Sequence, residues 1–274
     1  METSGSQSSP IKFAADTLKD YYELTKPGIT LSVVASMLIG FIMGAAGSLN
    51  YVLMAHAMLG TYLIAAGTSA HNMFQNGFIF SPVLIFAGLA YLLAMVNVVA
   101  GVVSLATTIL YLFAYTPLKR ISALNVFVGA VPGALPVVGG WAAASGTIFE
   151  HGMWILFGIV FCWQVPHVIA IAWVCRKDYE HAGFKMLPKN DPMGVKAAVW
   201  VLLPMIILFP TIYKLFVMDL VSWIYLTGSL LTTAVFLYYG VKFAIYRSVS
   251  TAKGVMFSSF AYLPLIWIFI FLDW

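Results

Sequence analysis

The segment PVLIFAGLAYLLAMVNVVAGVVSLATTILYLFAY, residues 82–115, decides the fold of this chain. It contains no charged residue, and it is longer than the roughly 20 residues that one helix needs to cross a bilayer. Asn97 and Gly101, near its middle, are typical of a turn. If the segment forms one helix, every later loop moves to the other side of the membrane. Its own residues leave both possibilities open.

The composition outside this segment is just as apolar. Hydrophobic residues make up 62% of the chain and charged residues 9%, whereas soluble domains carry about 25% charged residues. We therefore expect an all-α, polytopic membrane helix bundle of about nine transmembrane helices. The apolar runs lie near residues 28–47, 51–70, 82–96, 99–115, 123–143, 153–174, 197–213, 220–240 and 255–272.

The basic residues favour two helices in residues 82–115. With nine crossings, all but one of the 14 Lys and Arg residues fall on the same side of the membrane as the N-terminus, and only Lys214 falls on the other. Basic residues concentrate in cytoplasmic loops. The pattern predicts a cytoplasmic N-terminus and an external C-terminus, in the cell (inner) membrane if the source is a bacterium or an archaeon.

The chain divides into a tail and one membrane domain. Residues 1–26 read as a cytoplasmic polar tail that ends in an interfacial amphipathic segment, Ile11–Leu24. Residues 27–274 form the transmembrane domain. The tail lacks the apolar core of a secretory signal, and the spacing of Cys162 and Cys175 suits neither a disulfide framework nor a metal site.

The longest polar insertion is RKDYEHAGFKMLPKNDPMGVK, from Arg176 to Lys196. Asp178 and Glu180 offer oxygen ligands to Mg²⁺, which binds through one or two carboxylates together with substrate phosphates. Basic side chains could hold the phosphates themselves; these are Arg176, Lys177, Lys185 and Lys189. The alternative is a solvated loop whose basic residues only set the topology.

A second polar cluster, YTPLKRISALN, runs from Tyr115 to Asn125 on the same predicted side. Lys119 and Arg120 could extend an anion site there. Their alternative role is again to fix the orientation of the chain in the membrane.

The run FCWQVPHVIAIAW places polar side chains inside an expected membrane helix around Pro166, which frees a backbone carbonyl. Trp163 precedes Gln164 and His167, and these two polar residues share a helix face. Polar groups at membrane depth are costly and usually face a cavity or a partner. A neutral His167 could orient a porphyrin or act as an acid or base, or it could make an interhelical hydrogen bond.

Two further helices admit two interpretations each. The run NVFVGAVPGALPVVGGWAAASG, rich in Gly, Ala and Pro, favours close helix packing over an irregular cavity wall. In the last helix, Ser258, Ser259 and Tyr262 could line a pocket, although interhelical hydrogen bonds are the simpler interpretation.

Four segments in this order resemble the protoheme IX farnesyltransferase family of intramembrane prenyltransferases: YYELTKPGIT (21–30), YTPLKRISALNVFVGAVPGALPVVGGW (115–141), WQVPHVIAIAWVCRKDYEHAGFKMLP (163–188) and AKGVMFSSFAYLPL (252–265). The resemblance implies nine helices around a central cavity with Mg²⁺ and farnesyl diphosphate at its cytoplasmic mouth. It also implies transfer of the farnesyl group to a vinyl group of protoheme IX, which gives heme O. The WQxPH and DYxxAGFxMLP patterns are typical of the heme-modifying branch.

The resemblance also suggests roles for individual residues. We expect Asp178 and Lys185 to be catalytic. The expected metal ligands are Asp178, Glu180 and Asn76. The expected substrate-binding residues are Lys119, Arg120, Arg176, Lys177, Trp163, Gln164, His167, Tyr179 and Asn72.

The chain departs from the family pattern after the second helix. Family members carry a run of the type NxxxDxxxD there, followed by RTxxRP. In this chain Asn72 stands where the run should begin and Asn76 at the position of its first acid, and GFIFSP follows directly. An amide oxygen can bind Mg²⁺ but brings no charge. The sequence therefore predicts that half of the electrostatic site is missing and that turnover is low.

Three functions compete on these observations. The first is heme O synthesis in the membrane. The second is a catalytically impaired homologue that binds heme or an isoprenoid, or that acts as an assembly partner of a terminal oxidase. A transporter would match the helix number and the broken helices, but no repeated half is evident. Expected partners are farnesyl diphosphate, protoheme IX and membrane lipid, with no nucleic acid.

Overall fold

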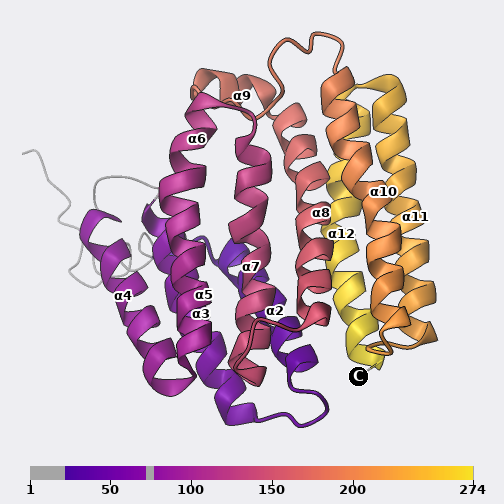
Figure 1. The fold of residues 1–274 in the computed structure, drawn as a ribbon. Helices are drawn as coiled ribbons and strands as arrows, with labels where there is room; N and C mark the ends of the chain where they lie inside the picture. The colour runs from indigo at the N-terminus through magenta and orange to yellow at the C-terminus, as the bar shows by residue number, and fades with distance from the viewer. Residues whose placement is uncertain (1–21, 72–76, 274) are drawn as a thin grey trace, which may run out of the picture.

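The computed structural model describes residues 22–71 and 77–273, and for residues 77–79 only the backbone. Most of the predicted interfacial segment Ile11–Leu24 lies outside these ranges. Every regular element within them is helical (Figure 1). The elements are α2 (Pro27–Gly44), α3 (Tyr51–His71), α4 (Gly77–Met95), α5 (Val98–Ile109), the π-helix η1 (Leu110–Tyr115), α6 (Thr116–Ile121), α7 (Asn125–Ser145), α8 (His151–Val174), α9 (Arg176–His181), α10 (Val195–Val217), α11 (Trp223–Tyr246) and α12 (Val249–Asp273).

The described helices include eight that are long and apolar enough to cross a membrane, with Val98–Ile121 counted as one span. A shorter apolar helix, Phe80–Met95, brings the bundle to the nine helices that the sequence predicts. The prediction of an all-α, multi-pass membrane bundle is confirmed.

Residues 82–115 divide into two helices at Asn97. This residue has an extended backbone (φ −165°) and caps α5, because its Oδ1 accepts a hydrogen bond from the N–H of Ala100. Its Nδ2 donates to the carbonyl of Ala142 on α7, 2.9 Å away. One amide thus satisfies the free N–H of a helix end and ties the turn to the next wall of the bundle.

The helix that begins at Val98 widens before it ends. Residues Leu110–Tyr115 form a π-helix, and the N–H of Thr116 bonds to the carbonyl of Tyr111. Pro117 follows and has no N–H to give to the carbonyl of Phe113, so an α-helical ladder could not continue unbroken. The wider turn brings the rings of Tyr111 and Tyr115 to 5.3 Å between centroids.

Helices α2 and α7 touch along their backbones. A Cβ atom on Gly140 would overlap the carbonyl oxygen of Met37, and one on Gly40 would overlap that of Val137. Small residues allow this approach where no aqueous hydrophobic effect drives helices together. The interpretation of the Gly-rich helix as a close-packing helix is confirmed.

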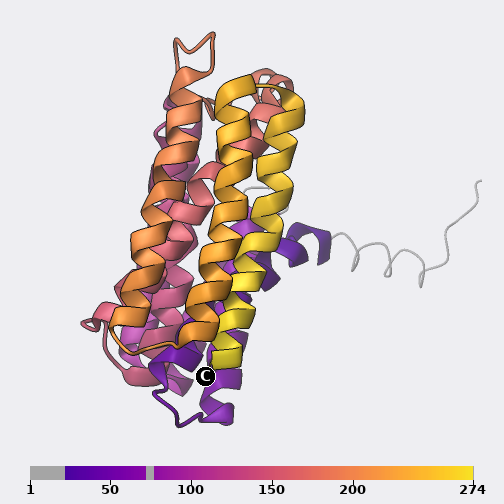
Figure 2. The same ribbon diagram turned by 90° about the vertical axis from the view of Figure 1, so that its right-hand side faces the viewer.

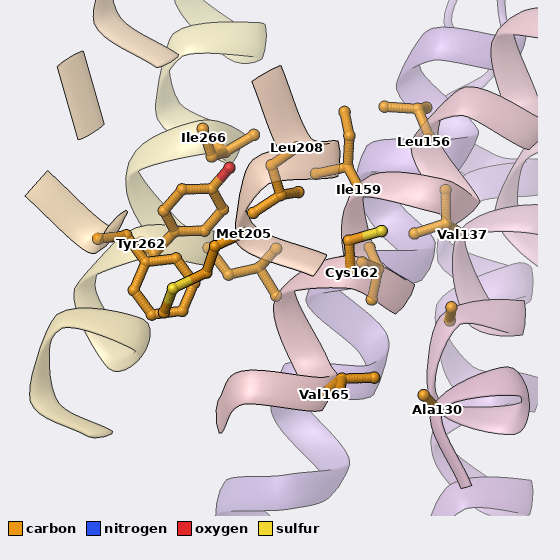
Figure 3. Packing of buried hydrophobic residues seen from close by; sticks show 14 of the residues in the cluster. Ala130, Val137, Leu156, Ile159, Cys162, Val165, Met205, Leu208, Tyr262 and Ile266 are labelled. Carbon is orange, nitrogen blue, oxygen red and sulfur yellow. The ribbon is translucent and has the colours of Figure 1, made fainter. Parts of the chain in front are cut away.

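The largest apolar core lies among α7, α8, α10 and α12 (Figure 3). Val165 and Ile159 of α8 belong to this core together with Met205 and Leu208 of α10, and all four side chains are fully buried. Helix α11 runs antiparallel to α12 (Figure 2) and adds the buried Phe236 and Phe243 to the same core.

The order of the helices gathers basic residues at one end of the bundle, which carries α6 and α9 and lies opposite the C-terminus (Figure 1). We call it the basic end. Its described basic residues are Lys26, Lys119, Arg120, Arg176, Lys177, Lys185, Lys189, Lys196, Lys242, Arg247 and Lys253. Lys214, near the other end of α10, is the exception that the sequence predicts, and Lys12 and Lys19 lie outside the described residues.

Candidate functional site

A cavity of about 640 Å³ opens inside the bundle. It is bounded by α2, α3, α5, η1, α7, α8 and α12, and its surface is mostly apolar. Several hydroxyl groups line it, from Ser32, Ser36, Thr61, Thr68, Ser69, Ser104, Thr107, Thr108, Tyr111 and Tyr115. Such a chamber suits a large apolar ligand that carries a few polar groups.

One wall comes from the irregular part of α7. Pro132, Gly133, Pro136 and Gly139 all line the cavity. A proline inside a helix leaves a carbonyl without its usual partner, which is tolerated at membrane depth beside a cavity. One set of small residues in α7 therefore packs closely against α2, and another set lines the cavity.

His167 faces the cavity from α8, and its orientation is fixed by α12. Its Nδ1 lies 2.7 Å from the Oγ of Ser259, which itself donates to the carbonyl of Met256 at 2.6 Å. Because that hydroxyl proton is already used, Ser259 accepts from Nδ1–H. The lone pair of His167 then lies on Nε2, which has no hydrogen-bond partner among the described residues.

Aromatic rings enclose this imidazole. Trp163 stacks on His167 with centroids 5.0 Å apart and an 18° interplanar angle, and Phe260 meets the ring edge-on at 5.1 Å. The indole N–H of Trp163 donates to the carbonyl of Ser259 at 2.8 Å. Two bonds to one residue of α12 thus hold both rings in place.

Gln164 presents its amide beside His167. A Cβ atom on Gly133 would overlap this amide where it now lies, so the glycine leaves the space that the amide occupies. The buried Oε1 has no hydrogen-bond partner within the described part of the chain. An unpaired acceptor on a cavity wall is ready to receive a donor from a ligand.

At the basic end, the connection between α8 and α10 docks onto the end of α6. The N–H of Lys185 donates to the carbonyl of Lys119 at 2.7 Å. The buried Asn125 donates from Nδ2 to the carbonyls of Lys185, at 2.7 Å, and Ser122, at 2.6 Å. The two polar clusters of the sequence therefore form one structural unit.

Two basic side chains of this unit lie over the ring of Phe184. The Nζ of Lys119 lies 5.1 Å from the centroid of this ring, and the guanidinium carbon of Arg120 lies 5.8 Å away. Lys119 also interacts electrostatically with Lys26, before α2. Three cations from two parts of the chain thus gather at this point.

Tyrosines connect the cationic unit to the cavity. Tyr115 lines the cavity and interacts electrostatically with Tyr111 and Tyr179. Tyr179 lies on α9, and its ring is 6.2 Å from Phe184. Burial raises the pKa of Tyr179, with a smaller contribution from Cys175, so the phenol stays protonated and can donate a hydrogen bond.

The predicted carboxylates are exposed. Asp178 and Glu180 lie on α9, and neither has an ion-pair or hydrogen-bond partner for its side chain among the described residues. Residues two apart on a helix point in different directions, so one ion could not use both. No group of three or more His, Cys, Asp or Glu side chains that could hold a metal occurs in the described ranges.

The remaining predicted residues differ in their surroundings. Arg176 lies over the ring of Trp173, 5.8 Å from its centroid, whereas Lys177 and Lys185 are exposed. The predicted Asn72 and Asn76 lie outside the described residues.

Sequence reasoning gave no role to three of the residues that shape the site, and it named no partner for a fourth. Asn125 and Phe184 lie inside the quoted polar clusters, but an amide and an aromatic ring there have no signature of their own. Tyr111 lies in the π-helix and lines the cavity, and the sequence did not predict a π-helix. Ser259 was expected to make an ordinary interhelical bond, which it does, but to the one histidine that lines the cavity.

Comparison with known proteins defines the class. Residues 74–263 match the model of the UbiA prenyltransferase family, and the chain belongs to that family. Within it, the chain is similar to proteins named protoheme IX farnesyltransferase. The protein of Solibacter usitatus is 35% identical, over 93% of this chain and 99% of its own length. That of Opitutus terrae is 33% identical, over 90% and 92%.

A mitochondrial protoheme IX farnesyltransferase of Arabidopsis thaliana is 32% identical over 89% of this chain and 62% of its own length. The alignment with the Solibacter protein extends over 289 positions, more than the 274 residues of this chain. That relative therefore contains residues that have no counterpart here, which agrees with a shortened chain.

The fold is also that of a solved structure. It is similar to a structure described as giving insights into digeranylgeranylglyceryl phosphate synthase in membranes, with a TM-score of 0.77 and 12% identity over 94% of this chain and 98% of the other. At this identity the likeness concerns the fold alone.

Proposed function

We propose that this chain transfers the farnesyl group of farnesyl diphosphate to a vinyl group of protoheme IX and so makes heme O. The observation that carries the proposal is the oriented His167, which faces an apolar cavity whose tyrosines lead to the cationic unit around Phe184. The similarity to protoheme IX farnesyltransferases supports the same reaction.

The reaction consumes both substrates and one water. The bond between C1 of the farnesyl chain and the diphosphate oxygen breaks, and diphosphate leaves with the electron pair. The terminal vinyl carbon attacks C1, and water adds to the resulting cation on the porphyrin side and loses a proton. The products are heme O and diphosphate.

The cationic unit binds the diphosphate in this proposal. Lys119, Arg120 and Lys185 stabilise the negative charge that grows on the leaving group, which lowers the barrier to ionisation. Arg176 and Lys177 lie on the next helix and extend the attraction to the phosphates. Tyr179, which keeps its proton, donates to a phosphate oxygen.

The donor set also suits a Mg²⁺ ion bound together with phosphate. Asp178 is an exposed carboxylate with no partner among the described residues, and Mg²⁺ needs only one or two carboxylates when phosphates supply other ligands. Glu180, which points elsewhere, could hold a second ion. When bound, the metal neutralises charge on the departing diphosphate.

The cavity protects the allylic cation. Its mostly apolar lining limits access of water, which would otherwise capture the farnesyl group. The rings of Tyr111 and Tyr115 lie between the cationic unit and the cavity interior, and aromatic faces stabilise a cation. The phosphates thus stay at the solvent-exposed end of the site, while the farnesyl chain and protoheme IX meet inside the apolar cavity.

The second substrate lies beside α8. His167 offers Nε2 to the iron of protoheme IX, while Trp163 packs beside the macrocycle and the free oxygen of Gln164 accepts a hydrogen bond. Ser259 is a positioning residue, because its bond to Nδ1 keeps the lone pair on Nε2. Along the axis of α8, His167 lies about 10 Å from Val174, where the helix ends at the basic end.

The basic end faces the cytoplasm in this proposal, because Lys and Arg concentrate in cytoplasmic loops. The N-terminus is then cytoplasmic, and in a bacterial or archaeal cell the membrane is the cell (inner) membrane. Farnesyl diphosphate reaches the site from the cytoplasm.

The test uses membranes that contain the full chain, protoheme IX and farnesyl diphosphate, with heme O measured by chromatography. The absorbance spectrum of bound protoheme is recorded in parallel for His167→Ala, Ser259→Ala and the control His56→Ala. His56 is a second intramembrane histidine, bonded to Tyr91 on α4 and outside the cavity.

We expect His167→Ala to abolish the spectral change on heme binding and Ser259→Ala to weaken heme binding about 10- to 100-fold. His56→Ala should behave as the unaltered chain. An unchanged spectrum for His167→Ala would remove the heme assignment, and no heme O from any substrate concentration would remove the reaction.

A further inference from the structure

A second hollow lies on the outside of the bundle, between α11 and α12. Its volume is about 460 Å³, and none of its lining residues lines the catalytic cavity. Buried Phe236 and Tyr262 form its floor, while Leu231 and Phe257 are 70% and 63% exposed at its rim. We call it the outer groove. It opens toward the region that lipid occupies around a multi-pass protein.

Two helical stripes line the outer groove, and both end in lysine. On α11 the stripe runs through Leu231, Val235 and Tyr239, and Lys242 lies one turn further along the same face. Helix α12 runs in the opposite direction. Its stripe passes back through Leu265, Ala261 and Phe257, and Lys253 lies one turn beyond.

Because the two helices run in opposite directions, both lysines lie at the same mouth of the groove, at the basic end. Arg247, in the short connection between the helices, adds a third positive charge. Residues 220–272 contain no Asp or Glu, so neither helix supplies a compensating carboxylate. Lys242 contacts Tyr238: its Nζ lies 5.1 Å from the ring centroid, and the two side chains also share a hydrogen bond.

We propose that the outer groove is a binding site for one anionic phospholipid. An acyl chain lies along the two apolar stripes, and the phosphate lies between Lys242 and Lys253. Charge complementarity favours an anionic occupant. A neutral lipid or a free isoprenoid would fill the groove but leave the lysines unused. Basic clefts between membrane helices attract acidic lipid headgroups. The proposal is independent of the reaction in the cavity.

The experiment titrates the purified full chain with palmitoyl-oleoyl phosphatidylglycerol or with phosphatidylcholine of the same chains and counts bound lipids by native mass spectrometry. The variants are Lys242→Gln, Lys253→Gln and the double variant. Lys214→Gln, at the opposite end of the bundle, is the matched control. Ala261→Phe, at an exposed position of the groove, tests the acyl part.

We expect each single variant to weaken the first phosphatidylglycerol about fivefold and the double variant about thirtyfold, with phosphatidylcholine unchanged. Ala261→Phe should weaken both lipids, because it fills the groove. The size-exclusion profile of each variant, together with its thermal midpoint in detergent, checks that it is folded.

Other outcomes overturn the proposal. Equal binding of the two lipids to the unaltered chain would make the groove a neutral-lipid site. The same loss in Lys214→Gln as in the double variant would show nonspecific charge attraction. Full phosphatidylglycerol binding by a folded Ala261→Phe chain would place the lipid on the connecting loop and outside the groove.

Discussion

The connection between α8 and α10 and the stretch of sequence between α3 and α4 differ in chemistry. The first carries the charged helix α9 and docks onto α6 through Asn125 and Phe184. The second, between His71 and Gly77, has no Asp, Glu, Lys or Arg. A diphosphate at the mouth of the cavity would thus be held from one side only.

We expect the charge-free stretch between α3 and α4 to affect catalysis more than folding. Helices α3 and α4 pack together along their length through Gly60, Gly67 and Gly88, where added Cβ atoms would meet the facing helix. These contacts lie within the two helices, outside the residues that connect them. A short connection can therefore leave the bundle intact while it removes charge from the site.

The largest effect should come from restoring the missing charge. A loop of the type NxxxDxxxD followed by RTxxRP, inserted between His71 and Gly77, should raise the rate of heme O formation by about a hundredfold or more, since each electrostatic contact to the transition state contributes about 3 kcal/mol. The rate is measured by chromatography in membranes. The control is the same loop with Asn in place of both Asp residues.

Equal heme O from the natural and grafted chains would show that one side suffices. It would also make the charge-free connection irrelevant to the rate.

Removing a carboxylate from the charged side should have the next largest effect. Asp178→Asn should abolish the Mg²⁺-dependent part of the binding of a non-hydrolysable farnesyl diphosphate analogue and slow the reaction by about a hundredfold. Glu150→Gln is the control, because this exposed carboxylate precedes α8 at the end of the bundle opposite α9. Binding is measured by calorimetry with and without Mg²⁺. Unchanged Mg²⁺ dependence in Asp178→Asn would contradict the assignment.

A smaller effect should follow from loosening the docked connection. Asn125→Ala removes two hydrogen bonds and leaves the carbonyl of Lys185 unpaired, which should cost about 1–3 kcal/mol of stability. It should also weaken binding of the diphosphate analogue. Asn97→Ala removes a comparable amide, which caps α5 and bonds to α7.

Asn97→Ala should lower the thermal midpoint in detergent as much as Asn125→Ala but leave the affinity for the analogue unchanged. If both variants weaken binding equally, the docking of the connection has no specific role.

The smallest effect concerns the aromatic ring between the cations. Phe184→Leu should raise the KM for farnesyl diphosphate about two- to fivefold, because a cation–π contact at a partly exposed site contributes about 0.5–1 kcal/mol. Phe184→Tyr keeps the aromatic face and should stay near the natural value. A similar KM for the Leu and Tyr variants would show that the ring only fills space.

Much of the fold follows from the sequence, because helix length and charge placement are simple constraints in a membrane. Loop charges predicted that residues 82–115 divide into two helices, and Asn97 and Gly101 indicated where. The chain-distant contacts were not predictable in this way: the bond from Ser259 to His167 joins residues on α12 and α8, and only packing of the whole bundle brings them together.

The site was predictable to different degrees. The expectation that residues 115–125 and 176–188 act together agrees with the bond between Lys185 and Lys119. The sequence did not show whether Asp178 and Glu180 could bind the same ion. Side chains two residues apart point in different directions on a helix, and that this segment is helical is known from the structure. The roles of these residues stay predictions.

The π-helix at Leu110–Tyr115 has a consequence for the tolerance of this chain to insertions and deletions. A wide turn of this kind holds one residue more than an α-helical turn. Deletion of a single residue there would restore a regular α-helix and leave the side chains on its two sides nearly in register, whereas the same deletion within a regular helix rotates one side by about 100° relative to the other. Ser104 and Thr107 would therefore keep their alignment with Lys119. We expect a one-residue deletion to be tolerated better at this turn than in α5, where it would turn the cavity wall away from the basic end.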